Sequence, residues 1–363
     1  MIKLEKTILF YINAIHEGGA ERVIIQLAHH FAQSGYRSIL VTSFIDDIEY
    51  DVPSDVIRLS LEQKQIQQSK FKRNYSRIKK LRKICKNEKP VCLISFMAEA
   101  NFRAIIACMG LSTKCITSVR NDPNMEYAGK LGYFIGKFIL PLSDGCVFQT
   151  EAAKEWFPNK LKAKSKIIFN AVDPSFFQVE RKPQKNIVTL GRLCLQKNHK
   201  LLIKAFSMIK DKYSEWNLLI YGIGDQEYNL NKLIKKLKLD NRVFLEGLTN
   251  DSQKVLSEAG IFVLSSDYEG LPNSLIEAMV VGVPSISTDC PCGGPKMIIK
   301  DKENGLLVPI NDEVRMAEAL DRLLNDYDYA EKLGLRAHID SKVFNPKYIF
   351  EDWKFFVEDI INK

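Results

Sequence analysis

Short runs of apolar residues alternate with amphipathic stretches along almost the whole chain, and this alternation limits the folds that it can adopt. The runs predict strands that are buried on both faces, and the amphipathic stretches predict helices that cover a sheet. The predicted strands are Thr7–Ile12, Ile39–Ser43, Val56–Leu59, Val91–Phe96, Cys115–Val119, Cys146–Gln149, Lys166–Phe169, Asn186–Gly191, Asn217–Tyr221, Val243–Glu246, Ile261–Leu264 and Pro284–Thr288, and helices between them include Glu21–Gln33, Lys200–Lys210, Leu230–Leu237 and Asn273–Val281. This order predicts an α/β protein with doubly wound parallel sheets, whose ligands bind beyond the carboxyl ends of the strands.

The pattern breaks between residues 170 and 185, and the break predicts two domains. Asn170–Pro174 and Glu180–Lys185 are polar or turn-forming and contain no apolar run. A chain of 363 residues has room for two domains of ordinary size. We therefore predict Rossmann-like domains at residues 1–175 and 176–345, followed by an amphipathic helix at residues 346–363.

The segment Glu269–Glu277 is the strongest indication of a binding site. It places one carboxylate on a loop and a second in a helix, across the bend Gly270-Leu271-Pro272 that leads into Asn273-Ser274. The start of a helix offers backbone N–H groups and a positive dipole to phosphate, and carboxylates accept hydrogen bonds from hydroxyls. The segment thus suits a sugar nucleotide. A second interpretation concerns Glu277 alone, because Ser274–Glu277 matches a capping box, in which the Glu side chain only closes the helix start.

Three glycine-containing loops follow predicted strands and are typical of phosphate-binding turns. Gly18-Gly19 follows the first strand, Gly191-Arg192 precedes Lys197, and Gly222 and Gly224 follow a later strand. Glycine lets a backbone approach a ligand closely, and the two cations Arg192 and Lys197 are suited to neutralise a diphosphate. Plain tight turns and solvated surface cations are the competing interpretations.

Other features narrow the class of protein. The eight cysteines form no CxxC or Cys/His grouping, so we expect no metal site and a reducing, cytoplasmic location. The first residues do not resemble a signal peptide, and no apolar run is long enough to span a bilayer. No grouping of Ser, His and Asp supports a nucleophile, although His16 lies beside a glycine loop, where it could carry a proton.

The positive charge is concentrated in the first half of the chain. Residues 1–175 contain 26 Lys and Arg against 17 Asp and Glu, whereas the remainder contains 26 against 27. The range Lys64–Lys89 holds 11 of these cations and one acidic residue, with apolar residues at helical spacing. A basic amphipathic helix is typical of proteins that bind an anionic membrane surface, and the alternative is a helix whose apolar stripe packs on its own domain. No nucleic-acid-binding motif is present, so we expect no nucleic-acid partner.

A second apolar segment, Gly129–Leu142, has the same two interpretations. Its aromatic and aliphatic residues could enter lipid, but a buried helix is the prediction that its composition favours.

Taken in order, these motifs resemble the retaining glycosyltransferases of family 4. The resemblance rests on Gly18-Gly19-Ala20-Glu21-Arg22, Gly191-Arg192-Leu193 with Lys197-Asn198, Gly222 with Gly224, and Glu269 with Glu277, and it extends over essentially the whole chain. It implies the GT-B fold, in which two facing Rossmann-like domains bind the acceptor and the donor, and in which the last helix crosses back to the first domain. It also implies metal-independent transfer, without a cofactor, from a nucleotide-diphosphate sugar.

The resemblance further implies roles for individual residues. Arg192 and Lys197 would hold the donor diphosphate, Glu277 the ribose and Glu269 the transferred sugar, while Leu248 would lie near the base. The remaining donor-binding positions would be Gly18, Gly19, Gly222, Gly224, Gly270, Leu271, Pro272, Asn273 and Ser274. Many members carry a histidine in the first domain that is missing here, and we name Arg120, Asn121 and His16 as acceptor-side candidates instead. The loop Arg120-Asn121-Asp122-Pro123 resembles that of bacterial surface-polysaccharide transferases.

These observations predict a hexosyl or N-acetylhexosaminyl transferase, using a UDP-sugar and a lipid-linked or lipopolysaccharide acceptor, at the inner face of the cell membrane. Two alternatives stay open at this point. One is a sugar-nucleotide epimerase or hydrolase of the same fold, and the other is a non-catalytic basic module that binds lipid or nucleic acid.

Overall fold

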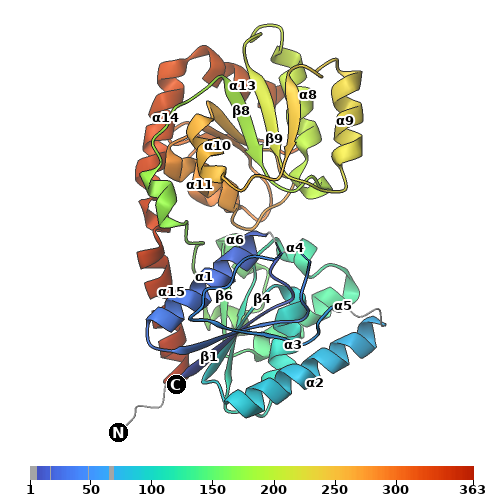
Figure 1. Ribbon diagram of the computed structural model, residues 1–363, viewed down its shortest axis with the longest axis vertical. Coiled ribbons are helices and arrows are strands. Elements are labelled where there is room, and N and C mark those ends of the chain that lie inside the picture. The colour runs from blue at the N-terminus through green and yellow to red at the C-terminus, as the bar shows by residue number, and fades with distance from the viewer. Residues whose placement is uncertain (1–5, 17, 48, 65–68) are drawn as a thin grey trace. The chain divides into compact units, whose positions relative to one another are not determined.

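The computed structural model describes residues 6–16, 18–47, 49–64 and 69–363 (Figure 1). They form two compact units, of which the first ends at Asn170 and also contains Lys347–Lys363, and the second spans Ala171–Pro346. Each unit is built around one parallel sheet with helices on both faces, as expected for alternating strands and helices. The doubly wound α/β class predicted from the sequence is confirmed.

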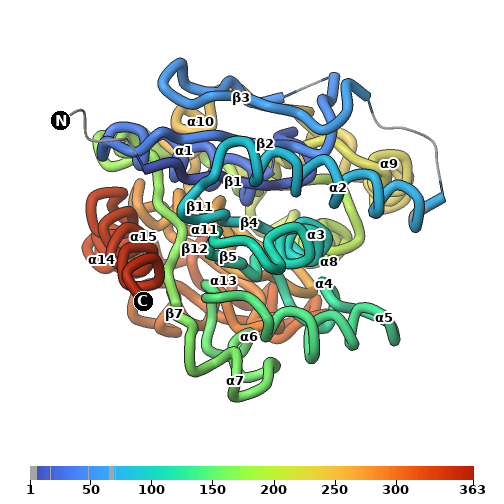
Figure 2. Tube along the Cα trace, turned by 90° about the horizontal axis from the view of Figure 1, so that it is seen from below, coloured from blue at the N-terminus to red at the C-terminus, as the bar shows by residue number. Residues whose placement is uncertain are grey.

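The first unit contains a seven-stranded sheet in the order β3-β2-β1-β4-β5-β6-β7, and Figure 2 labels its strands except β6. Its strands are β1 (Thr7–Ile12), β2 (Arg37–Thr42), β3 (Ile57–Ser60), β4 (Cys92–Phe96), β5 (Lys114–Ser118), β6 (Gly145–Phe148) and β7 (Ser165–Ile167). Its helices are α1 (Gly19–Gln33), α2 (Lys70–Glu88), α3 (Ala98–Cys108), α4 (Pro123–Glu126), α5 (Gly129–Phe134), the π-helix η1 (Ile135–Ile139), η2 (Leu140–Leu142), α6 (Glu151–Glu155) and α7 (Asn159–Lys162). The strand order reverses between β1 and β4.

The second unit contains a six-stranded sheet in the order β10-β9-β8-β11-β12-β13. Its strands are β8 (Asn186–Leu190), β9 (Asn217–Tyr221), β10 (Val243–Gly247), β11 (Ile261–Leu264), β12 (Ser285–Thr288) and β13 (Leu306–Val308). Its helices are η3 (Pro174–Gln178), η4 (Leu195–Lys197), α8 (His199–Ile209), α9 (Glu227–Lys236), α10 (Ser252–Glu258), α11 (Asn273–Val281), α12 (Gly294–Ile298), α13 (Glu313–Asn325), α14 (Tyr327–Asp340) and η5 (Ser341–Phe344). Here the strand order reverses between β8 and β11.

The last helix, α15 (Pro346–Ile361), packs on the sheet of the first unit. Trp353 is fully buried and stacks on Phe96, with ring centroids 5.8 Å apart. At Gly145 a Cβ atom would lie 2.3 Å from the side chain of Ile360, so glycine lets the helix approach β6 closely. The apolar face predicted for this helix is therefore the face that the first unit buries.

The basic helix α2 is packed on its own domain in one part and exposed in another. From Arg77 onward it packs on the domain, where Leu81 is buried, and Arg77 forms a buried ion pair with Glu62 at 2.7 Å. Its N-terminal half exposes Phe71 and Tyr75 to solvent, at 83% and 67% of their surface. Residues 65–68 of the predicted range Lys64–Lys89 lie outside the described residues.

The prediction of a buried helix over Gly129–Leu142 is wrong. The segment forms α5, η1 and η2, and α5 has no buried residue. Leu131, Phe134 and Phe138 are exposed over 70%, 50% and 60% of their surface, whereas Leu140 is buried. The helical turns change type within the segment, so its apolar residues do not share one inward face.

Candidate functional site

The site of the second unit lies where its strand order reverses. The loops after β8 and β11 are neighbours there, and hydrogen bonds join them: Asp267 N–H donates to the Gln196 carbonyl at 2.8 Å, and the Ser265 hydroxyl donates to the Lys197 carbonyl at 2.9 Å. Asn198 adds a side-chain bond of 2.7 Å to the Asp267 carboxylate. In open parallel sheets this reversal point is where ligands bind, because the two loops diverge from it.

Lys197 and Glu269 form an ion pair across this point. The Lys197 ammonium donates to Oε1 of Glu269 at 2.6 Å, and the Ser266 hydroxyl donates to the same oxygen at 2.7 Å. The side chains of Lys197 and Glu269 are only 15% and 9% exposed. The structure thus brings together two predicted site residues that are 72 positions apart in the sequence. Ser266 was not predicted as a site residue, since a lone serine in a loop has no distinctive sequence signal, and Asn198 was quoted in the Lys197-Asn198 motif without a role.

Glycines allow these loops to pack without side chains between them. A Cβ atom on Gly222 would lie 2.0 Å from the Gly191 carbonyl oxygen, and one on Gly224 would lie 2.3 Å from the Leu193 carbonyl oxygen. Both glycines were predicted to contact the donor, and the structure shows that each is needed for the close packing of these loops. Gly294, which the sequence analysis missed, is tighter still, because its Cβ would lie 1.6 Å from the Gly270 carbonyl oxygen.

Helix α11 begins at Asn273, as predicted, but the capping-box interpretation is wrong. Pro272 occupies the N-cap position and makes no side-chain capping bond, so Ser274 lies inside the helix. Ser274 is therefore not the N-cap residue that a capping box with Glu277 requires. Glu277 is nevertheless buried, with 4% of its surface exposed. Its role in ligand binding stays a prediction.

The other predicted donor residues differ in exposure. Gly270, Leu271 and Pro272 are buried in the bend before α11. Arg192 is exposed on the loop after β8, and Leu248 is 46% exposed on the loop after β10. Both side chains can therefore reach a ligand in solvent without displacing the core.

In the first unit, the reversal point between β1 and β4 carries the Gly18-Gly19 turn. Gly18 is the N-cap of α1, and its carbonyl accepts a hydrogen bond from Arg22 N–H at 3.2 Å. His16, just before the turn, is exposed and its Nδ1 atom lies 2.8 Å from an Asp46 oxygen. Gly18 thus begins the helix as predicted, with the Glu21 carboxylate against it, since a Cβ atom on Gly18 would lie 2.2 Å from a Glu21 oxygen, while His16 is engaged with an acidic neighbour.

Arg120 lies beyond the carboxyl end of β5 and is 92% buried. Its guanidinium lies over the Phe96 ring, 4.3 Å from the centroid, and donates to Oδ1 of Asn170. Two of its nitrogens, Nε and Nη1, are buried without a hydrogen-bond partner among the residues that the structure describes. Burial lowers the pKa of Arg120 to about 9, so it remains a cation at neutral pH. Asn121 uses its side-chain oxygen to accept the Asp122 N–H at 2.9 Å, which makes Arg120 the stronger acceptor-side candidate of the two.

Glu126 lies beside Arg120. One of its oxygens accepts the backbone N–H groups of Arg120 and Asn121, each at 3.2 Å. Burial raises the pKa of the Glu126 carboxyl from 4.5 to about 7, although these hydrogen bonds lower it in part. A carboxyl of this kind changes charge within the range of physiological pH.

The substitution Glu126→Gln is expected to change how stability depends on pH. Because the folded-state pKa is raised, the unfolded chain ionises first, and the wild type loses stability as pH rises from about 4.5 to about 7. The glutamine keeps the carbonyl acceptor but does not titrate. We expect the variant to gain about 2–3 kcal/mol over the wild type across this interval, with a constant difference above pH 7. Urea unfolding at a series of pH values measures this, and parallel curves for both proteins would contradict it.

Among the described residues, no group of three or more His, Cys, Asp and Glu side chains is placed to hold a metal ion. In the same part of the chain, no helix is both long and apolar enough to cross a membrane.

Comparisons with known proteins show the family of this chain. The family profile Glycosyltransferase Family 4 matches residues 17–176, and the profile Glycosyl transferases group 1 matches residues 173–339. An uncharacterised glycosyltransferase of Methanocaldococcus jannaschii is 30% identical over 347 residues, which cover 80% of this chain and 84% of that protein. An α-1,4-N-acetyl-D-galactosaminyltransferase of Campylobacter jejuni, named for GalNAc-α-(1→4)-GalNAc-α-(1→3)-diNAcBac-PP-undecaprenol, is 28% identical over 362 residues, 98% of this chain and 99% of the relative.

Solved structures share the arrangement at lower identity. The Anabaena protein HepE, in complex with UDP and glucose, superposes with a TM-score of 0.81 at 16% identity and covers 98% of this chain and all of its own. Sucrose-phosphate synthase from Thermosynechococcus elongatus reaches a TM-score of 0.85 at 18% identity, over 99% of this chain and all of its own. The fold, the two family matches and the Methanocaldococcus relative together show that this chain belongs to the family 4 glycosyltransferases, which have the two-domain GT-B fold.

Proposed function

We propose that this glycosyltransferase is retaining, and that it moves a hexose or N-acetylhexosamine from a nucleotide-diphosphate sugar to a saccharide acceptor. The favoured donor is a UDP-sugar, and the favoured acceptor is lipid-linked or lipopolysaccharide saccharide in bacterial surface-glycan synthesis. The Lys197–Glu269 pair carries this proposal, because it sets a cation for a diphosphate against a carboxylate for sugar hydroxyls. Two relatives support this acceptor class by their names. One is the Campylobacter protein, and the other is an amylovoran biosynthesis glycosyltransferase of Erwinia amylovora that is 24% identical over 366 residues.

In the proposed reaction, the bond between the anomeric carbon and the diphosphate oxygen breaks, and a bond between that carbon and the acceptor oxygen forms on the same face of the sugar. The acceptor proton passes to the leaving diphosphate. Lys197 and Arg192 stabilise the negative charge that develops on this group, so the step needs no metal or cofactor. Glu269 orients the sugar and Glu277 the ribose, while the N–H groups of Gly270 to Ser274 meet phosphate and sugar oxygens.

The basic and apolar surfaces of the first unit support a membrane-facing acceptor domain. On α2, Lys72, Lys79 and Lys83 are exposed, as are Phe71 and Tyr75. We define the apolar surface of α5 and η1 as Leu131, Tyr133, Phe134 and Phe138, and Lys130 and Lys137 lie within its segment. Lysines beside exposed aromatic residues suit the boundary between anionic headgroups and acyl chains, where each cation contributes about 1 kcal/mol. We therefore place the protein peripherally at the cytoplasmic face of the membrane.

The double substitution Phe134→Asp with Phe138→Asp is expected to weaken membrane binding about tenfold or more, since it puts two charges where apolar side chains would enter lipid. The measurement is co-sedimentation with vesicles of phosphatidylglycerol and phosphatidylethanolamine. Leu335→Asp is the matched control, because this residue is 63% exposed on α14 of the second unit. Equal binding of all three proteins would contradict the membrane assignment.

The transfer reaction is tested with a panel of nucleotide sugars, a membrane extract as acceptor and mass spectrometry of the products. The proposal expects nucleoside diphosphate to be released only when acceptor is present, and a product with the anomeric configuration of the donor. Donor turnover without acceptor would instead support an epimerase or hydrolase. Vesicle binding without any turnover would support a non-catalytic module.

A further inference from the structure

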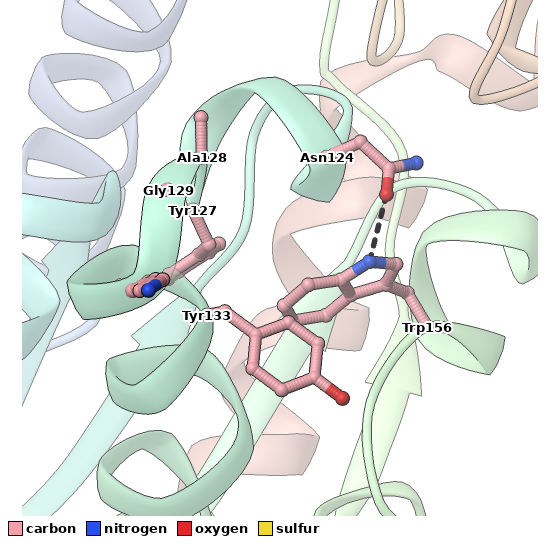
Figure 3. Close-up of a pocket in the computed structure, with 7 residues that line it drawn as sticks. Asn124, Tyr127, Ala128, Gly129, Tyr133 and Trp156 are labelled. Atoms are coloured by element: carbon pink, nitrogen blue, oxygen red, sulfur yellow. Dashed lines mark hydrogen bonds between the residues drawn. The ribbon is translucent and has the colours of Figure 1, made fainter.

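A pocket of about 510 Å³ lies in the first unit, in segments that leave the carboxyl ends of β5 and β6 (Figure 3). The loop from α4 into α5 forms one side, and Trp156 after α6 forms the other. Its lining residues are Asn124, Tyr127, Ala128, Gly129, Lys130, Tyr133 and Trp156. This is the size at which proteins bind small molecules or single sugar rings, and nothing in the site described above uses it.

The indole of Trp156 is held rigidly in this pocket. Its Nε1–H donates to Oδ1 of Asn124 at 2.9 Å, as the dashed line in Figure 3 marks. The Tyr127 ring stacks on it, with the two ring centroids 6.0 Å apart, and the Lys137 ammonium lies 3.8 Å from the indole centroid. Four independent contacts, including the edge of Tyr133 at 5.8 Å, therefore fix the ring before any ligand arrives.

Tyr133 supplies the accessible wall. It is 55% exposed on α5, and Figure 3 shows its ring beside Trp156. An aromatic ring of this kind offers an apolar face and a polar end, which matches a pyranose, whose C–H groups form an apolar face and whose hydroxyls surround it. The Asn124 amide and the Lys130 ammonium are polar groups at the same pocket that can bind hydroxyls.

We propose that this pocket binds a sugar ring of the acceptor saccharide, through contact with the Tyr133 face and the edge of Trp156. The inference rests on the proposed transferase function and extends it to the acceptor. The pocket belongs to the first unit, whereas the cations assigned to the donor diphosphate belong to the second. Tyr133 also belongs to the apolar surface of α5 and η1 that we assign to the membrane, so the lipid of a lipid-linked acceptor would be anchored next to the pocket.

The pocket is tested with Tyr133→Ala, Tyr133→Phe and the matched control Tyr228→Ala, which removes a tyrosine that is 77% exposed on α9 of the second unit. The acceptor is a saccharide on a short alkyl diphosphate, which does not require a membrane. We expect Tyr133→Ala to raise the KM for this acceptor about tenfold, because one aromatic contact is lost, with an unchanged KM for the donor. Tyr133→Phe keeps the ring and should stay within about twofold of the wild type. Equal acceptor KM values for Tyr133→Ala and Tyr228→Ala would overturn the proposal.

A binding measurement separates this inference from the proposed transfer. Ligand-observed NMR is recorded with the methyl α-glycosides of glucose, galactose, N-acetylglucosamine and N-acetylgalactosamine, and separately with UDP. Contact with at least one glycoside that Tyr133→Ala abolishes, while UDP binding is unchanged, supports the pocket even if no transfer is found. No glycoside contact in the wild type, or contact that survives in Tyr133→Ala, overturns it. If UDP fails to bind, the donor site is wrong and the glycoside result still decides the pocket.

Discussion

Lys197→Ala is expected to lower kcat for sugar transfer about a hundred- to a thousandfold. The ammonium is held within the site by Glu269 at 2.6 Å and is 15% exposed, so it acts on a developing diphosphate charge with little screening by water. The loss should appear in kcat more than in donor affinity, because the leaving group gains charge as the bond breaks. Steady-state kinetics with a saturating acceptor measures both.

Substituting Glu269, the partner of Lys197, is expected to affect stability as well as turnover. Glu269→Ala leaves the Lys197 ammonium without its carboxylate in a mostly buried position, and we expect a stability loss of about 3 kcal/mol as well as loss of turnover. Lys204→Ala is the matched control, because the Lys204–Glu313 pair belongs to the same unit but its side chains are 33% and 40% exposed. The free energy of unfolding of Lys204→Ala should stay within about 0.5 kcal/mol of the wild-type value, and the variant should keep full activity. If Lys197→Ala and Glu269→Ala retain wild-type turnover, the catalytic site lies elsewhere.

Gly294→Ala is expected to damage both folding and donor turnover, although residue 294 carries no functional group. Its Cβ would lie 1.6 Å from the Gly270 carbonyl oxygen, so the backbone of the Gly270–Leu271 bend must move. We expect a loss of about 2–4 kcal/mol in the free energy of unfolding. Displacement of the bend by an ångström would also lower turnover by roughly a hundredfold, because the N–H groups at the start of α11 would no longer meet the donor.

The control for this substitution is Gly110→Ala. Gly110 has a φ of +70° and no neighbouring atom within 4 Å of a Cβ, so alanine costs only the backbone strain of about 1–2 kcal/mol. Its turnover should match the wild type. Urea unfolding and donor kinetics on the two variants separate strain from displacement of the site. Wild-type turnover in Gly294→Ala would show that the bend does not position the donor.

The strands and helices were predicted well where the local pattern was strong. Thr7–Ile12, Asn217–Tyr221, Ile261–Leu264 and the helix Asn273–Val281 have the predicted bounds, and the other predicted strands overlap the observed ones with shifted ends. The strand Leu306–Val308 was missed, because three residues are too few to form a periodic pattern. Local sequence determines which residues are apolar and at what spacing, and that is sufficient for elements of ordinary length.

The exposure of an apolar segment was not determined by its own sequence. Gly129–Leu142 and the N-terminal half of α2 have compositions that suit a core as well as a surface. The structure exposes Phe71, Tyr75 and Phe138, since neighbouring elements cover only part of each segment. Burial depends on what packs against a residue, and those neighbours come from distant parts of the chain.

The sequence by itself determined the α/β class and the division into two units, because the periodicity of apolar residues and the turns between elements are local properties. It did not determine that Lys197 pairs with Glu269, that Pro272 rather than Ser274 precedes α11, or that Gly294 holds the Gly270 bend in place. These features lie in the loops that follow β8, β11 and β12. Only the parallel order of these strands, which stabilises contacts between residues far apart in the chain, brings their carboxyl ends to one edge of the sheet.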